Sequence, residues 1–193
     1  MKIKYALIGC GRIAKNHILA AKNNDLEIVA LCDIDFPKIS GIIQSSNIEN
    51  GEQIGKYRDY KTLVFENKLD IVAIATESGK HAEIALFCIE NRINVIIEKP
   101  MAMSMEDAQR IIDASKKYNV KVTVCHQNRF NLAIQKTREA LENGRFGKLS
   151  HGTIQVRWNR NRNYYDQALW RGTWEQDGGA LMNQCIHGID LLI

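Results

Sequence analysis

The chain has 193 residues, of which 45% are apolar and 25% are charged, and its formal net charge is +4. This composition is typical of a globular protein, and the charge is too small and too dispersed to indicate binding to nucleic acid. No apolar run reaches the length of a membrane span, and the N-terminus enters a predicted strand directly, so we expect no membrane segment and no signal peptide. Five cysteines without Cys-x-x-Cys spacing predict reduced thiols in a cytoplasmic protein.

Predicted strands and helices alternate along the first two thirds of the chain. Strands are expected near 3–8, 27–32, 56–57, 70–75, 94–97 and 120–125. Helices are expected near 12–23, 36–45, 60–67, 80–91 and 104–118, and Ser104 with Asp107 forms a variant capping box for the last of them. Repeated units of one strand and one helix predict an α/β fold with a doubly wound parallel sheet.

A glycine-rich turn, Gly9-Cys10-Gly11-Arg12-Ile13-Ala14, follows the first strand at once. Gly9 permits a tight turn, Gly11 leaves room for a pyrophosphate, and Ala14 lets the helix pack closely on the strand. The anion would bind the free amides at the start of the helix. The candidate residues for binding a dinucleotide here are Gly9, Gly11, Arg12 and Ile13.

An acidic residue follows the second strand, about 20 residues beyond the turn, as the dinucleotide fingerprint requires. Asp33 comes directly after the apolar run Glu27–Cys32. Its carboxylate can accept hydrogen bonds from both hydroxyls of an adenosine ribose and would repel a 2′-phosphate, which favours NAD over NADP. The alternative is that Asp33 caps the next helix, a role for which Asp35 competes.

The pattern changes after about residue 125. A helix near 130–143 is expected to end at Asn143-Gly144, Leu149–Trp158 predicts an antiparallel strand, and another helix follows Asp177. The sequence ends within an apolar helix that has no cap, which predicts a truncated chain. We therefore expect residues 1–125 to form a Rossmann domain that binds NAD, and residues 126–193 to be the N-terminal part of an incomplete second α/β domain.

Glu98-Lys99-Pro100 follows the fifth strand, at the edge where open α/β sheets bind ligands. The proline fixes the turn, in a trans or a cis peptide, and would hold Lys99 rigidly. Lys99 could orient a substrate hydroxyl or share its proton. The alternative is a surface lysine paired with Glu98.

The final helix carries Asn183 and His187, four residues apart on one face, with Asp190 three residues further on. A histidine titrates near neutral pH, so His187 can take the proton of an alcohol that is being oxidised. Asn183 could orient the imidazole or bind a sugar hydroxyl. The alternative is a structural histidine whose ring nitrogens make hydrogen bonds within a packed helix. No histidine pair has metal-ligand spacing with an open coordination shell, so we expect no metal site.

The turn at 9–14, Glu98-Lys99-Pro100 and the helical His187 together resemble the glucose–fructose oxidoreductase / inositol dehydrogenase / MocA family. The resemblance covers the whole chain and implies a Rossmann domain followed by an α/β domain whose open sheet often builds the oligomer, so a full-length homo-oligomer is expected. It implies that Lys99 and His187 are the catalytic pair, and that Thr76 and Glu77 lie where the backbone of relatives passes the cofactor. Many relatives carry Asp where Asn183 stands.

Three further runs are similar to the UDP-N-acetylglucosaminuronate 3-dehydrogenases of bacterial surface-polysaccharide synthesis, in which Asn at position 183 is normal. The runs begin at His126, at Tyr164 and at Gly178. The resemblance implies that NAD oxidises the 3-hydroxyl of a nucleotide sugar to a ketone, with His187 as general base and Lys99 hydrogen-bonded to the reacting oxygen.

An anionic substrate needs cationic partners, and guanidinium groups bind phosphate and carboxylate bidentately. The candidates for binding the substrate beside Lys99, Asn183 and His187 are Arg129, Arg157, Arg160, Arg162 and Arg171. The alternative, which we favour for any single arginine, is a solvated strand edge. Gln127 and Glu98 are expected to face the cofactor, since each follows a predicted strand. His17 and His81 are expected to be structural, and His126 is open to either role.

Three other functions remain open at this point. They are a dehydrogenase of another sugar or polyol, a non-catalytic NAD-binding regulatory relative, and a methyltransferase, which also uses a glycine-rich strand-turn-helix. The presence of both Lys99 and His187 argues against a regulatory protein. A methyltransferase would leave Lys99-Pro100 and the last helix unexplained.

Overall fold

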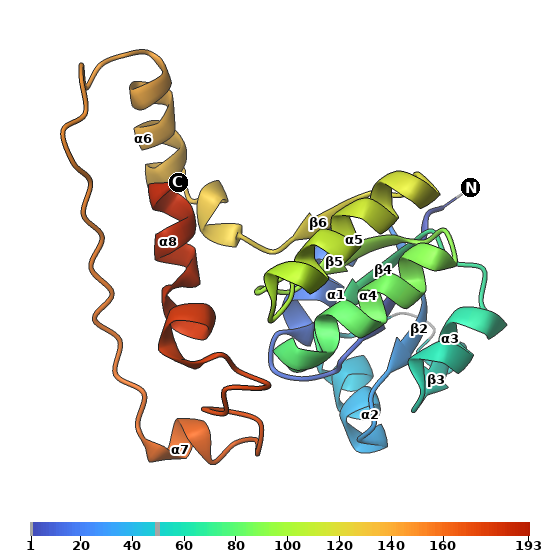
Figure 1. The fold of residues 1–193 in the computed structure, drawn as a ribbon. Helices are drawn as coiled ribbons and strands as arrows, with labels where there is room; N and C mark the ends of the chain where they lie inside the picture. Colours follow the sequence, from blue (N-terminus) through green and yellow to red (C-terminus); the bar gives the residue numbers. More distant parts are fainter. Residues whose placement is uncertain (1, 49–50) are drawn as a thin grey trace. The chain divides into compact units, whose positions relative to one another are not determined.

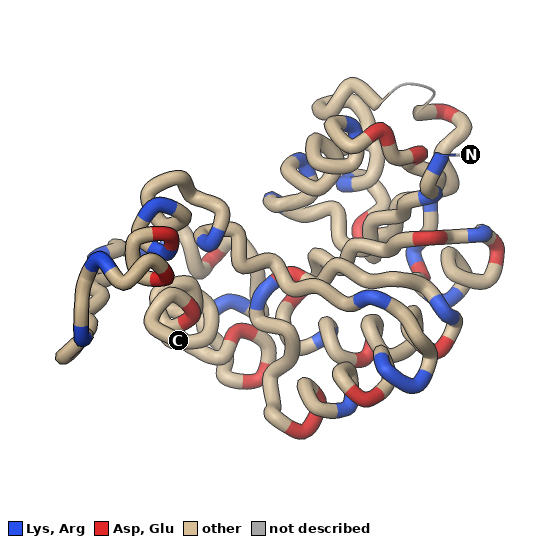
Figure 2. Tube along the Cα trace, turned by 90° about the horizontal axis from the view of Figure 1, so that it is seen from above, with Lys and Arg blue, Asp and Glu red and all other residues tan. Residues whose placement is uncertain are grey.

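A computed structural model describes residues 2–48 and 51–193. The chain divides into two compact units, the first ending at Val124 and the second comprising Cys125–Ile193. Lys and Arg are interspersed with Asp and Glu along the first unit, whereas residues 143–165 of the second unit carry Lys and Arg but no Asp or Glu (Figure 2). Within the described ranges, no helix combines the length and the apolar character that crossing a membrane would require.

The first unit is built on a parallel six-stranded sheet with the order β3-β2-β1-β4-β5-β6 (Figure 1). The strands are β1 (Lys4–Ile8), β2 (Glu27–Cys32), β3 (Gly55–Tyr57), β4 (Ile71–Ile74), β5 (Asn94–Ile97) and β6 (Val122–Val124). The strand order reverses between β1 and β4, which is the doubly wound arrangement of a Rossmann fold and confirms the predicted fold class. Ligands of such sheets bind at the carboxyl ends of the strands at this reversal.

The helices of the first unit lie close to their predicted positions. They are α1 (Ala14–Asn23), α2 (Phe36–Ser45), α3 (Tyr60–Glu66), the 3-10 turn η1 (Ser78–Lys80), α4 (His81–Glu90) and α5 (Met105–Tyr118). Ser104 caps α5, because its Oγ accepts the Asp107 amide at 3.0 Å and also donates to the Asp107 carboxylate at 3.0 Å. The predicted capping pair is therefore confirmed.

The sheet is buried on both faces because its strands are apolar at nearly every position. Alternate residues of β1 enter two separate cores. Tyr5 and Leu7 pack in the core that includes residues of α1 and α2, whereas Ala6 and Ile8 pack in the core that includes residues of α3, α4 and α5. These two layers hold the carboxyl ends of β1 and β4 in place.

The five cysteines are free thiols, and Cys10, Cys32 and Cys88 lie within these cores. Burial raises the pKa of each of these three thiols to about 12. They are therefore protonated at neutral pH, in the manner of inert structural cysteines.

The second unit is helical in its regular parts. It contains the 3-10 turn η2 (Gln127–Phe130), α6 (Leu132–Glu142), the short α7 (Arg162–Tyr165), the π-helical turn η3 (Leu181–Cys185) and α8 (Ile186–Leu192). The expected end of α6 at Gly144 is present, since Gly144 has a φ of +68° and the next amide, of Arg145, donates to the Ala140 carbonyl at 2.9 Å.

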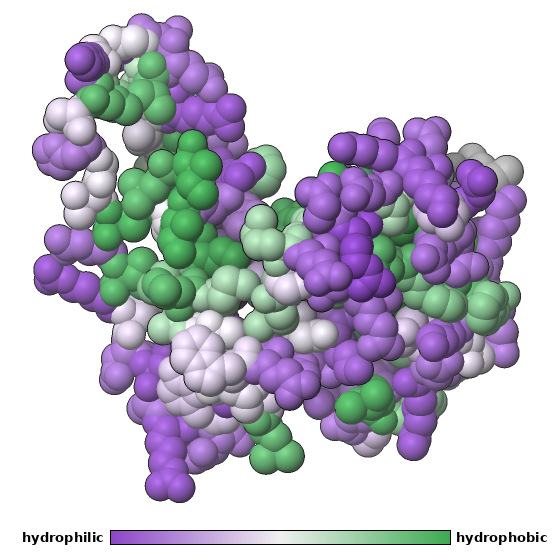
Figure 3. All heavy atoms as spheres, viewed as in Figure 1, coloured by the Kyte–Doolittle hydropathy of each residue, from purple (hydrophilic) through white to green (hydrophobic). Residues whose placement is uncertain are grey.

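The strand expected over Leu149–Trp158 is wrong for this structure, which has no strand in that described segment. The segment is extended, and its apolar and polar side chains still alternate. Ile154 and Val156 lie next to Gly188 of α8, since a Cβ added to this glycine would be 3.2 and 3.6 Å from their side-chain atoms. The intervening Gln155 instead accepts a hydrogen bond from Arg157 at 2.8 Å. Figure 3 shows apolar side chains gathered in this part of the second unit. A strand needs a second strand to pair with its backbone, and alternation alone does not supply one.

Candidate functional site

The glycine-rich turn lies at the carboxyl end of β1, where the strand order reverses. Gly9 has a φ of +98°, and a Cβ there would lie 2.5 Å from the carbonyl atoms of Ala75 and 2.7 Å from the Thr76 amide nitrogen. The Gly9 amide donates to the Cys32 carbonyl at 2.8 Å. Only glycine fits, because backbone conformation and space both exclude a side chain. The structure thus brings the predicted residues Gly9 and Thr76 together.

The start of α1 fits an anionic group. A Cβ on Gly11 would have no atom within 4 Å, so the backbone here faces open space. Ile13 stands at the N-cap of α1, and its apolar side chain cannot cap the first amides. Ala14 is buried against the sheet. The amides of Ala14 and Asn16 donate to the Gly11 and Ile13 carbonyls at 3.1 and 3.0 Å, which leaves the turn itself and its open approach for an anion. A helix N-terminus of this kind can bind the pyrophosphate of a dinucleotide.

Both carboxylate oxygens of Asp33 accept backbone hydrogen bonds. The Cys10 amide donates to Oδ2 and the Asp35 amide donates to Oδ1, each at 2.8 Å. Asp35, rather than Asp33, occupies the N-cap position of α2. A carboxylate has about four acceptor sites, so Asp33 can anchor the glycine-rich turn and still accept hydrogen bonds from ribose hydroxyls.

Glu98 ties the end of β5 to α1. Its Oε1 lies 3.0 Å from His17 Nε2, and its Oε2 accepts the Lys99 amide at 3.3 Å. Burial alone would raise the pKa of Glu98, but the hydrogen bonds and charges of His17 and Lys99 together outweigh burial and hold this pKa below its ordinary value. Glu98 is therefore ionised at neutral pH. The next residue, Lys99, is half-buried, and the peptide between Lys99 and Pro100 is cis.

His81 joins the loop after β4 to the loop after β5. Its Nδ1 lies 2.7 Å from the Pro100 carbonyl oxygen, and its Nε2 lies 3.2 Å from the Thr76 carbonyl oxygen. Burial lowers the pKa of His81, which favours the neutral ring. A neutral imidazole has one N–H and donates to one of these carbonyls at a time. The sequence analysis assigned His81 a structural role, and its contacts connect the two loops that carry Thr76 and Lys99.

In the second unit, three polar side chains, those of Arg129, His126 and His187, gather around Asp190 of α8. Arg129 donates from Nε to Oδ2 at 2.7 Å and from Nη2 to Oδ1, while His126 Nδ1 lies 3.5 Å from Oδ2. The ring of His126 meets that of His187 edge to face, with 6.1 Å between centroids. The hydrogen bond from Arg129 holds the pKa of Asp190 below its ordinary value. The sequence analysis did not foresee that Arg129 pairs with Asp190.

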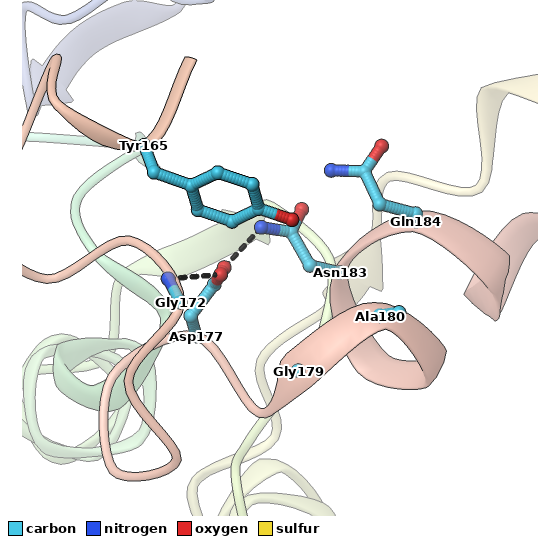
Figure 4. A pocket seen from close by; sticks show the side chains of 7 residues that line it. All are labelled: Tyr165, Gly172, Asp177, Gly179, Ala180, Asn183 and Gln184. Carbon is cyan, nitrogen blue, oxygen red and sulfur yellow. Dashed lines mark hydrogen bonds between the residues drawn. The ribbon is translucent and has the colours of Figure 1, made fainter. Parts of the chain in front are cut away.

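A second group of polar residues lines a hollow of about 370 Å³ (Figure 4). The predicted residue Asn183 is part of this lining, together with Tyr165, Gly172, Asp177, Gly179, Ala180 and Gln184. Asp177 is only 2% exposed and accepts hydrogen bonds from the Gly172 amide, at 2.7 Å, and from Asn183 Nδ2. The sequence analysis missed Asp177 as a site residue. The available signal was an acidic residue directly before Gly178-Gly179 and six residues before Asn183.

The predicted arginines have different surroundings. Arg171 stacks on the rings of Tyr164 and Trp170, with its guanidinium carbon 4.5 and 4.6 Å from their centroids, and donates to the Tyr164 hydroxyl at 2.8 Å. Gln184, which lines the hollow, donates to the same hydroxyl at 2.9 Å. Arg162 instead lies 3.5 Å from Asp166 on the exposed surface of α7. The structure therefore connects Arg171, but not Arg162, to the residues around the hollow.

Two protein-family models match the chain. The model of the oxidoreductase family with an NAD-binding Rossmann fold, GFO_IDH_MocA, matches residues 3–126, and that of the GFO/IDH/MocA C-terminal domain matches residues 134–193. D-apiose dehydrogenase of Paraburkholderia graminis is 32% identical over 157 residues, which is 81% of this chain and 40% of that protein.

Two solved structures are similar over the whole chain. The WlbA dehydrogenase of Bordetella pertussis, in complex with NADH and UDP-GlcNAcA, is 38% identical with a TM-score of 0.91, and the match covers 100% of this chain and 59% of that one. The WlbA dehydrogenase of Chromobacterium violaceum, crystallised with the same two ligands, is 36% identical with a TM-score of 0.91, covering 100% and 55%. The chain thus spans about half the length of the relatives it matches.

Proposed function

Because this chain belongs to the Gfo/Idh/MocA family of oxidoreductases, we propose that it is part of an NAD-dependent dehydrogenase that oxidises the 3-hydroxyl of UDP-N-acetylglucosaminuronate. The observation that carries this proposal is the likeness over both units to two dehydrogenases crystallised with NADH and this nucleotide sugar. That likeness includes the segment with Asn183 and His187. The open backbone at Gly11 supports the dinucleotide part of the proposal.

In this proposal the first unit holds the cofactor. The backbone from Gly9 to Ile13, with Gly11 and Arg12, binds the pyrophosphate, and Asp33 accepts hydrogen bonds from the adenosine ribose. The other residues assigned to the cofactor are Thr76, Glu98, Lys99 and Gln127. When bound, NAD supplies the acceptor for a hydride from the sugar carbon.

The acid–base chemistry is assigned to Lys99 and His187. His187 takes the proton of the sugar hydroxyl as general base, and Lys99 donates a hydrogen bond to the same oxygen as negative charge develops on it. Asn183, Arg129, Arg162 and Arg171 are assigned to the substrate. Because Arg129 is paired with Asp190, a substrate anion would have to share this guanidinium with that carboxylate. A homo-oligomeric, cytoplasmic full-length protein completes the proposal.

The first test is calorimetric titration of the purified protein with NAD⁺ and NADP⁺, each with and without the UDP-sugar. We expect NAD⁺ to bind more tightly, and Asp33→Asn to raise the affinity for NADP⁺ relative to NAD⁺ by about tenfold, since it removes a negative charge facing the 2′-phosphate. The quantity to compare is the ratio of the affinity for NADP⁺ to that for NAD⁺. Asp33 also anchors the turn, so the substitution is expected to weaken the binding of both dinucleotides. Asp35→Asn is the matched control and should leave the ratio unchanged.

Other outcomes separate the competing functions. Binding of NAD⁺ without any effect of the UDP-sugar would favour another sugar or polyol. A regulatory relative would be favoured by two results together. The protein would bind NAD⁺ and the UDP-sugar without producing NADH absorbance, and the His187→Asn variant would behave identically. Failure to bind either dinucleotide would refute the proposal.

A further inference from the structure

The hollow beside α8 contains a buried carboxylate that the proposed chemistry does not use. We propose that Asp177 is a positioning residue: it fixes the amide of Asn183 so that the carbonyl oxygen, and not the nitrogen, is presented to the ligand. Position 183 then selects a hydrogen-bond donor, such as a sugar hydroxyl or an N-acetyl N–H. This inference rests on the proposed function only for the identity of the ligand.

The orientation of Asn183 follows from the chemistry of its partner. A primary amide carries donors on its nitrogen and acceptors on its oxygen, whereas an ionised carboxylate only accepts. Asn183 Nδ2 donates to Asp177 Oδ1, and Figure 4 shows the Asn183 oxygen turned away from this contact. The reverse orientation would place the amide oxygen against a carboxylate oxygen, two acceptors with no proton between them. A charge-assisted hydrogen bond is therefore exchanged for repulsion when the amide turns over.

Asp177 is itself held by the loop that precedes the helix. Its Oδ2 accepts the Gly172 amide at 2.7 Å, and its own amide donates to the Thr173 carbonyl at 3.0 Å. Gly172 has a φ of +75°, and a Cβ there would lie 3.2 Å from the ring of Tyr165, so this turn requires glycine. One carboxylate oxygen is thus committed to the loop and the other to Asn183.

The burial of Asp177 is costly and therefore informative. The side chain is 2% exposed, and the salt bridges found among the described residues do not include it. Its two recorded hydrogen bonds come from neutral donors. Burying a carboxyl group costs free energy unless its oxygens are hydrogen-bonded, and an apolar side chain would fill the same space without that requirement. A carboxylate at position 177, unlike an apolar side chain, fixes which end of the Asn183 amide faces the hollow.

The test uses an exchange of the two side chains. In Asp177→Asn, the new amide keeps the Gly172 contact through its oxygen and turns its nitrogen toward position 183, so Asn183 turns over and presents a donor. We expect the KM for the UDP-sugar to rise about tenfold, the scale of one lost hydrogen bond, with the Kd for NAD⁺ unchanged. The reciprocal double variant Asp177→Asn/Asn183→Asp again presents an acceptor at 183 and should return the KM to within about threefold of the original.

The control is Glu175→Gln, which makes the same chemical change in the same loop on an exposed side chain and should leave the KM unchanged. An unchanged KM in a folded Asp177→Asn protein would overturn the inference. So would a folded double variant that fails to recover.

A second measurement does not depend on activity or on the stability of the variants. In the unaltered protein, the Asn183 side-chain amide, assigned by its loss in Asn183→Asp, should show one proton exchanging with water at least about tenfold more slowly than exposed asparagine amides. Exchange at the exposed rate would overturn the inference. If the unaltered protein does not bind the UDP-sugar, the proposed function fails, while this measurement still decides the orientation of Asn183.

Discussion

The two units of the chain bury different kinds of residue. In the first unit the buried positions form two apolar cores, with a few polar residues such as His17 and His81 among them. In the second unit the buried residues of the described chain are Asp177, His187 and Gly188. Apolar burial stabilises the first unit in the usual way. The burial of Asp177 and His187 costs free energy, so we interpret it as serving a site rather than stability.

The largest expected consequence of this difference is in amide hydrogen exchange. Amides of the central strands β1 and β4 should exchange at least about a thousandfold more slowly than those of the extended segment at residues 149–158, because the strands open only with the whole unit. Mass spectrometry of exchanged peptides measures both regions in one sample. Comparable protection of the two regions would show that the second unit is more ordered than its contacts indicate.

A pair of glycine substitutions in one turn separates folding from ligand binding. Gly9→Ala should destabilise the protein by about 3 kcal/mol, since it adds strain at a φ of +98° and a clash with the Ala75 and Thr76 backbone. Gly11→Ala meets no atom within 4 Å and should leave the melting temperature within about 2 °C while weakening NAD⁺ binding. Thermal unfolding and calorimetry measure the two effects. Equal destabilisation by both variants would contradict the geometry of the turn.

His81 tests whether a polar residue in the first unit supports the site rather than the core. His81→Ala leaves a cavity and removes the contacts of the ring with the Thr76 and Pro100 carbonyls, so we expect a loss of about 2 kcal/mol in the free energy of unfolding. We also expect weaker NAD⁺ binding, measured under conditions where the variant is folded. The control His151→Ala changes an exposed histidine of the second unit and should alter neither quantity.

The smallest effect is expected from Glu98→Gln, because glutamine keeps an acceptor for His17 and the variant loses only the contribution of the charge. This loss is largest at neutral pH and shrinks in acid. The pKa of Glu98 is lowered in the folded protein, so its ionised form contributes stability that is fully present above the ordinary pKa of 4.5 and is lost as the pH falls through the lowered folded value. Urea unfolding between neutral and acidic pH should therefore show a shallower loss of stability in Glu98→Gln than in the control Glu52→Gln. Parallel curves would mean that the contacts with His17 and Lys99 do not lower this pKa.

The sequence predicted those features of the fold that depend on the residue pattern of a single helix or strand. The bounds of β2, α2 and β5 and the cap at Ser104 follow from apolar runs, spacing and local hydrogen bonds. The fingerprint predicted a glycine at position 9 for the tight turn, but not its approach to Ala75, which joins residues far apart in sequence. The pairs Arg129–Asp190 and Asp177–Asn183 join loops to helices without any periodic signal. Such contacts depend on how a loop returns to its helix, which spacing does not determine.

The π-helical turn η3 places Asn183 and His187 differently from the regular helix that the sequence suggests. In an α-helix two residues four apart share a face, but hydrogen bonding from i to i+5 widens the turn and rotates each following side chain relative to those before it. Such a widened turn is equivalent to one residue inserted into an α-helix. A variant lacking Met182 would therefore recover a regular helix at little cost in stability, yet would turn Asp177 and its loop by about 100° relative to His187, the angle that one α-helical residue spans. The length of this segment, and not only its composition, therefore sets the angle between Asp177 and His187.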